Sequence, residues 1–249
     1  MPPVSISRLP SERLRDLLLV CLTFGTGAVD AISFLGLGRV FTAMMSGNIV
    51  LLGLAVGSSA GPEAVRSAVS LVVYALGVFA ASRLIRNPTS NPTKSSVWPA
   101  GLTMALVCGA VAQAGVLAGW LGASGHPNDV FKGVLVGFSA LAMGLQGGAV
   151  ARLGVSGVTT TYVTGTLTGL IGGLAVRSGT QRELARRAVV LVALLVGAAC
   201  GAVLLTYARS WAPVLPLAST VVVIATAIYR LPRAQTLDAP EAHGAGQQA

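Results

Sequence analysis

The chain has 249 residues, of which 53% are hydrophobic and 10% are charged, and its mean hydropathy is +0.76. A water-soluble domain carries about 25% charged residues, so this composition excludes an ordinary soluble protein and predicts an integral membrane protein. The net charge of +9 does not indicate nucleic-acid binding, because Lys and Arg flank the apolar blocks, where they face lipid headgroups.

Eight apolar segments follow one another along the chain, several of them near the ~20 residues that cross a bilayer as a helix. They are Leu17–Leu35, Val40–Gly57, Ala68–Ile85, Val97–Leu121, Val134–Leu153, Val158–Val176, Ala188–Ala208 and Val214–Tyr229. Residues 1–16 are expected to form a cytoplasmic N-terminal segment, and residues 230–249 a disordered tail. The basic N-terminus resembles a signal peptide, but the apolar run continues without a convincing cleavage site, which favours a retained first helix.

The chain contains an internal repeat. Leu35–Val40 resembles Leu153–Val158, which lies 118 residues later. Glu63-x-x-Arg66 recurs as Glu183-x-x-Arg186, 120 residues later, and a similar apolar pattern follows both. A charged motif with matching surroundings indicates the duplication of a four-segment unit. The two predicted repeats span residues 17–121 and 134–229 of a single transmembrane domain.

The distribution of Lys and Arg predicts how the two repeats are oriented. If all eight segments crossed the membrane, the side of the N-terminus would hold 11 of these residues and the other side 6. If segments two and six each enter and leave on one side, the counts become 13 and 4, which the positive-inside rule favours. The sequence therefore predicts an all-α bundle of two inverted repeats, each with three spans and one broken or re-entrant segment. Both termini would lie in the cytoplasm.

Two long motifs carry a family resemblance that covers roughly Leu17 to Tyr229. The first is Gly27–Leu35 followed by Val40–Asn48, and the second is Met143–Gln146 followed by Thr159–Leu167. Both resemble signatures of the YoaK-like family, which comprises uncharacterised bacterial inner-membrane proteins with about six spans. The resemblance implies a multi-pass fold in the bacterial cytoplasmic membrane, and it implies no established activity.

Asp30 is the only acidic residue within an apolar segment. A carboxylate in hydrocarbon is costly, so Asp30 is expected to face the bundle interior or a wet cavity and to have a partner. One interpretation is a proton or cation coupling site. The other is a structural ion pair, for which Arg39 is the nearest candidate along the chain.

The two motifs also predict a binding site. Both place a Gly between hydroxyl or amide side chains in the middle of an apolar segment, where a helix break would expose backbone N–H groups near the bilayer centre. Tight helix packing is the alternative interpretation, and Gln146 could equally form an interhelical hydrogen bond. The predicted substrate-binding residues are Asp30, Ser46, Gly47, Asn48, Gln146, Thr160, Thr161, Thr164, Gly165 and Thr166.

No pattern predicts catalysis, a cofactor or a metal site. The three Cys residues are isolated in apolar blocks, the two His residues lie in a loop and the tail, and no familiar catalytic motif stands in a fitting context. The favoured function is a secondary transporter or transporter-like channel for a small molecule or ion, and not an enzyme. The alternative is a non-transporting assembly factor or sensor subunit. The expected partners are the lipid bilayer and the solute, without nucleic acid, and the sequence leaves a homo-oligomer open.

Overall fold

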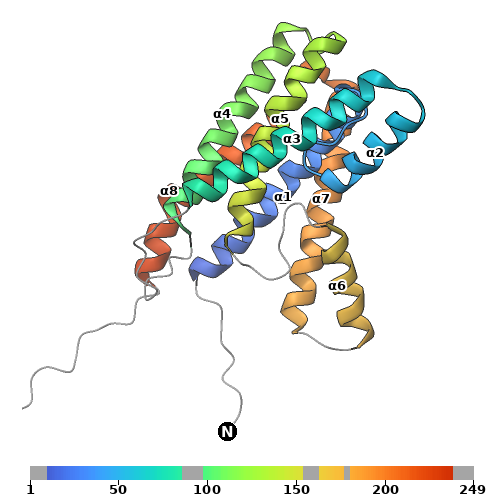
Figure 1. Ribbon diagram of the computed structural model, residues 1–249. Coiled ribbons are helices and arrows are strands. Elements are labelled where there is room, and N and C mark those ends of the chain that lie inside the picture. Colours follow the sequence, from blue (N-terminus) through green and yellow to red (C-terminus); the bar gives the residue numbers. More distant parts are fainter. Residues whose placement is uncertain (1–9, 86–97, 154–162, 177–179, 238–249) are drawn as a thin grey trace, which may run out of the picture.

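The computed structural model describes residues 10–85, 98–153, 163–176 and 180–237, and all regular elements within these ranges are helices (Figure 1). The helices are α1 (Pro10–Gly36), α2 (Met45–Gly57), α3 (Gly61–Leu84), α4 (Ala100–Gly122), α5 (Asp129–Ala151), α6 (Val163–Ala175), α7 (Gln181–Tyr207) and α8 (Val214–Leu237). A short 3₁₀ turn, η1 (Arg209–Trp211), separates the last two.

Six of these helices are long and apolar enough to cross a membrane, in agreement with the number of spans predicted from the sequence. The other two, α2 and α6, have 13 residues each. At 1.5 Å per residue they extend about 20 Å, whereas the hydrocarbon core is about 30 Å thick. A long, a short and two long helices therefore follow one another in both halves of the chain.

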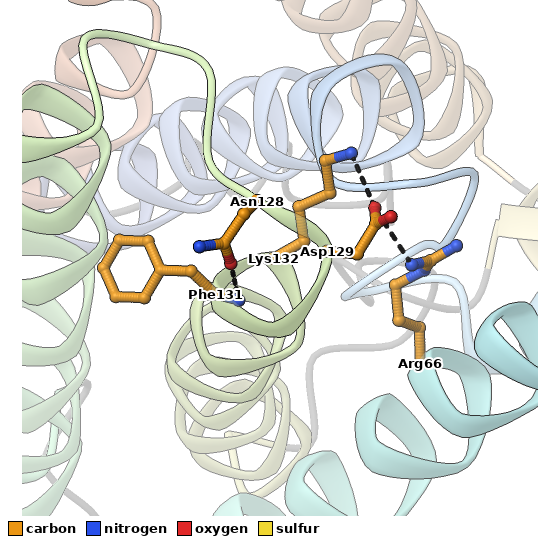
Figure 2. Close-up of polar contacts among 5 residues, drawn as sticks. All are labelled: Arg66, Asn128, Asp129, Phe131 and Lys132. Atoms are coloured by element: carbon orange, nitrogen blue, oxygen red, sulfur yellow. Dashed lines mark hydrogen bonds and ion pairs between the residues drawn. The ribbon is translucent and has the colours of Figure 1, made fainter.

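The first and last residues of several helices differ from the bounds of the predicted apolar segments. Four long helices, α1, α3, α5 and α7, begin five to seven residues earlier than predicted because polar first turns continue the helix. Caps explain two of these starts: the side chain of Asn128 accepts from Phe131 N at 2.9 Å (Figure 2), and that of Thr180 accepts from Glu183 N at 3.3 Å. At the other end of the chain, α8 continues to Leu237, so residues 230–237 are helical and do not belong to the disordered tail that the sequence predicted.

Helix packing follows the same scheme in both halves. The first helix of each half, α1 or α5, packs against the third and fourth helices of the other half: α1 against α7 and α8, and α5 against α3 and α4. Each short helix packs against the third helix of its own half, α2 against α3 and α6 against α7. Figure 1 shows α2 and α6 at opposite ends of the bundle.

Glycines allow the two tightest crossings. A Cβ on Gly197 of α7 would overlap the carbonyl oxygen of Phe24 in α1. Likewise, a Cβ on Gly77 of α3 would lie 2.7 Å from the carbonyl oxygen of Leu141 in α5. Gly77 and Gly197 are 120 residues apart, the same offset as the Glu-x-x-Arg motifs, so the repeat in the sequence marks equivalent contacts. Small residues at such positions let membrane helices approach closely.

Candidate functional site

The candidate site lies where α1 meets the irregular segment 37–44 that leads into α2. Asp30, which is 4% exposed, points from α1 toward this segment. Its Oδ1 accepts hydrogen bonds from the backbone N–H groups of Thr42 at 2.9 Å and Ala43 at 2.8 Å. Its Oδ2 is buried, and no group within the described residues donates to it. A buried carboxylate thus uses one oxygen to hold the chain and leaves the other available.

Arg39 does not pair with Asp30. The Arg39 side chain is exposed, and within the described ranges neither residue forms an ion pair. The prediction that Arg39 is the ion-pair partner of Asp30 was therefore wrong. The carboxylate instead accepts hydrogen bonds from backbone N–H groups in a segment that is not helical. A structural role remains, since Asp30 satisfies two buried N–H groups.

Asn48 anchors the same segment from the first turn of α2. Its side chain is fully buried, accepts from Phe41 N at 2.9 Å, and donates to the carbonyl oxygen of Phe41 and to Ser70 Oγ. Ser70 Oγ, on α3, also donates to the Phe41 carbonyl oxygen at 2.8 Å. The break expected at Ser46–Asn48 lies instead in residues 37–44, because these polar side chains replace the helical hydrogen bonds that the segment lacks.

A chain of hydroxyl groups continues from this segment into the bundle. Thr42 Oγ1 accepts from Ser33 Oγ at 3.5 Å and lies 3.0 Å from Ser139 Oγ on α5. Ser33, Ser139 and Gln113 of α4 line a cavity of about 20 Å³, enough for a single water molecule. Sequence reasoning did not select these four residues for the site, because single Ser, Thr and Gln residues in apolar stretches give no pattern until the helices are packed.

Gln146 joins α5 to α1. Its Nε2 donates to Thr26 Oγ1 at 2.9 Å, and Thr26 in turn donates to the carbonyl oxygen of Leu22. Gln146 is buried, 4% exposed. Of the two interpretations of Gln146, this contact supports the interhelical hydrogen bond.

The part of the second motif at the start of α6 does not lie beside Asp30 and segment 37–44. Thr164 is exposed and Thr166 is buried in the first turns of α6, with Gly165 half-buried between them. Thr160 and Thr161 lie outside the described residues. Because α2 and α6 are at opposite ends of the bundle, Ser46–Asn48 and Thr164–Thr166 do not line a common space (Figure 1). The expectation that the two signatures meet near the midplane was wrong: each short helix stays beside the third helix of its own half.

A larger pocket opens at the end of the bundle where α1 terminates. It has a volume of about 670 Å³, and Phe34, Arg39, His126, Lys132 and Arg209 are among the residues that line it. The same pocket brings the end of α1 next to the start of α5, so these two helices run in opposite directions. The sequence did not predict this pocket, because its basic residues come from separate connections.

A pair of aromatic side chains connects this pocket with the segment that Asp30 binds. Phe34, which lines the pocket, stacks on Phe41 with ring centroids 4.9 Å apart. Phe34 follows Asp30 by four residues, about 6 Å along the axis of α1. The carboxylate therefore lies about one helical turn below the pocket, beneath the segment that Asn48 holds.

Comparison with known proteins places the chain in a family. The model of a family described as "Protein of unknown function (DUF1275)" matches residues 18–227. The chain is also 35% identical to the UPF0700 transmembrane protein YoaK of Bacillus subtilis (strain 168) over 161 residues, which cover 65% of this chain and 67% of that protein. No solved structure shows a significant match. With six helices long enough to span a bilayer, the chain is an integral membrane protein that belongs to the YoaK-like DUF1275 family.

Proposed function

We propose that the protein is a secondary transporter or transporter-like channel for a small solute in the bacterial cytoplasmic membrane, with both termini in the cytoplasm and no catalytic activity. The observation that carries the proposal is Asp30: a buried carboxylate in a membrane-spanning helix, bound on one oxygen only, beside a broken segment. Ionisable residues inside membrane bundles are costly and commonly mark ion or proton pathways.

Two ion pairs support the inverted-repeat architecture that goes with this function. Arg66 of α3 pairs with Asp129 at the start of α5, with 3.7 Å between Nη1 and Oδ1. Arg186 of α7 pairs with Asp16 near the start of α1, with 3.9 Å between Nη1 and Oδ2. The two arginines are equivalent in the repeat, and each contacts the first helix of the other half. The opposite directions of α1 and α5 support the same proposal, that the halves are inverted repeats, a common transporter design.

A route to Asp30 is suggested by the pocket at the end of α1. The pocket reaches one face of the bundle, and Phe34, which lines it, stacks on Phe41 in the segment that Asp30 binds. Segment 37–44 is held by side-chain hydrogen bonds from Asp30, Asn48 and Ser70, with no helical ladder of its own, so a small rearrangement would open it. Alternating access requires such a gate on one side of the site.

The alternative, a non-transporting assembly factor or sensor subunit, is favoured by one observation. Below the aromatic pair, the cavity found between α1, α4, α5 and α8 measures only about 20 Å³, and its lining is mostly apolar. This cavity shares no lining residue with the pocket at the end of α1, so the two are separate in this conformation. This packing fits both a transporter in a closed state and a protein that does not transport. A measurement of solute flux distinguishes the two.

The test is solute flux in proteoliposomes, screened across small anions, cations and metabolites, with a pH-sensitive dye to follow protons. Asp30→Asn keeps an oxygen that can accept both backbone bonds and removes the charge, so the protein should fold while coupled flux is lost. Glu63→Gln removes the same charge at an exposed position and should transport normally. Equal flux in the two variants would reject the coupling role, and flux no faster than in protein-free liposomes would favour the alternative.

A further inference from the structure

The pocket at the end of α1 gathers positive charge from three connections of the chain. Arg39 comes from the α1–α2 connection, Lys132 from the start of α5, and Arg209 from the turn between α7 and α8. His126, in the α4–α5 connection, completes the polar lining, which contains no acidic residue among the described ones. A volume of about 670 Å³ falls within the range of ordinary small-molecule sites, about 300–1,000 Å³.

Two of these cations are held in different ways. Arg209 is fixed: its Nε donates to the Gly125 carbonyl oxygen at 2.8 Å, and its guanidinium lies over the ring of Trp120. Trp120 Nε1 donates back to the Arg209 carbonyl oxygen at 2.8 Å. Arg39 is exposed and forms no hydrogen bond or ion pair within the described chain, so its guanidinium is available to a ligand.

The carboxylate of Asp129 lies beside this cluster and pairs with both Lys132 and Arg66. Asp129 Oδ1 lies 3.0 Å from Lys132 Nζ and 3.7 Å from Arg66 Nη1 (Figure 2). The guanidinium of Arg66 also packs against Gly38, where φ is +100° and a Cβ would lie 2.7 Å from Nε. Four cations therefore surround one end of the bundle, with a single acidic side chain, 75% exposed, among them.

Anchoring to lipid headgroups does not explain this arrangement. In the proposed topology this face carries only four Lys and Arg residues, and they are the four just described: Arg39, Arg66, Lys132 and Arg209. The positive-inside rule concentrates basic residues on the opposite face and gives no reason to collect the remaining ones around one cavity. Asp129 offsets part of the charge of Lys132 and Arg66, whereas Arg39 has no acidic partner within the described residues, so a bound anion would stabilise the cluster.

We propose that this pocket binds a phosphate group, carried either by a small soluble anion or by a phospholipid headgroup. A phosphate presents several charged oxygens and can meet cations from three directions, and the planar forks of Arg39 and Arg209 suit such oxygens. The apolar wall that Phe34 and Leu35 supply would contact the body that carries the phosphate. This inference concerns binding and does not depend on whether the protein transports a solute.

The test measures binding of inorganic phosphate by calorimetry to the full chain in dodecyl maltoside micelles, which contain no phosphate. Arg39→Gln should weaken binding by about tenfold, which corresponds to about 1.4 kcal/mol. Asp129→Asn should strengthen it several-fold, because Lys132 and Arg66 lose their competing carboxylate. The control is Arg83→Gln, an equal loss of charge at an exposed position at the end of α3, and it should bind like the wild type.

A second arm distinguishes the two sources of the phosphate group. In nanodiscs that contain phosphatidylglycerol, a headgroup site would show competition with inorganic phosphate and a bound lipid by native mass spectrometry, lost in Arg39→Gln. A site for a soluble anion would bind phosphate equally in the micelles and in these nanodiscs. The proposal is overturned if the wild type binds neither phosphate nor lipid, or if Arg39→Gln and Arg83→Gln behave alike, and thermal unfolding of each variant verifies that it is folded.

Discussion

Asn48 should stabilise the protein as the anchor of the segment that precedes α2. Asn48→Ala removes the acceptor for Phe41 N and both donor bonds, to the Phe41 carbonyl oxygen and to Ser70 Oγ. A buried N–H without a partner costs about 1–3 kcal/mol and each lost donor bond about 0.5–1.5 kcal/mol, so we expect a loss of about 2–6 kcal/mol. Asn48→Asp should be at least as harmful, because a carboxylate cannot donate to the carbonyl oxygen it would face.

The matched control is Ser46→Ala. Ser46 lies two residues earlier in the same turn of α2, is exposed, and forms no side-chain hydrogen bond within the described residues. Its replacement should change stability by no more than about 0.5 kcal/mol. Thermal or denaturant unfolding in detergent micelles measures both variants. If Asn48→Ala unfolds like Ser46→Ala, then the hydrogen bonds to Phe41 do not stabilise the segment and the structural interpretation of Asn48 fails.

Three further predictions concern topology, packing and the buried carboxylate. Reporter domains fused after Gly57 and after Val176 should lie on opposite sides of the membrane, and a cytoplasmic signal from both would exclude the inverted repeat. Gly197→Ala should destabilise the fold by about 1–3 kcal/mol, because the new Cβ meets a backbone carbonyl oxygen of α1. Gly172→Ala, with no atom within 4 Å of the new Cβ, should be neutral or slightly stabilising in the same unfolding assay. Asp30→Ala should lower stability by about 2–6 kcal/mol, because two buried N–H groups lose their acceptor, whereas Asp30→Asn should unfold like the wild type.

Much of the fold could be predicted from the sequence because the length of an apolar run is a local property. The eight apolar runs of the sequence reappear as eight helices, and the distribution of Lys and Arg predicted that six of them span the membrane, which agrees with the six helices that are long enough to do so. The sequence also predicts a repeat, because Glu63-x-x-Arg66 and Glu183-x-x-Arg186 keep their spacing, and the ion pairs of Arg66 and Arg186 support it. Burial of Asp30 followed from the cost of a carboxylate in lipid.

Contacts between distant residues decided the rest. The start of α2 depends on hydrogen bonds that Asp30, Asn48 and Ser70 make to segment 37–44, and spacing along the chain cannot show which side chain reaches which backbone group. The pocket beside Arg39 joins three connections that are neighbours only after the helices pack. The two motifs lie apart because each short helix packs against the third helix of its own half, a consequence of helix packing that equivalent positions in a sequence do not reveal.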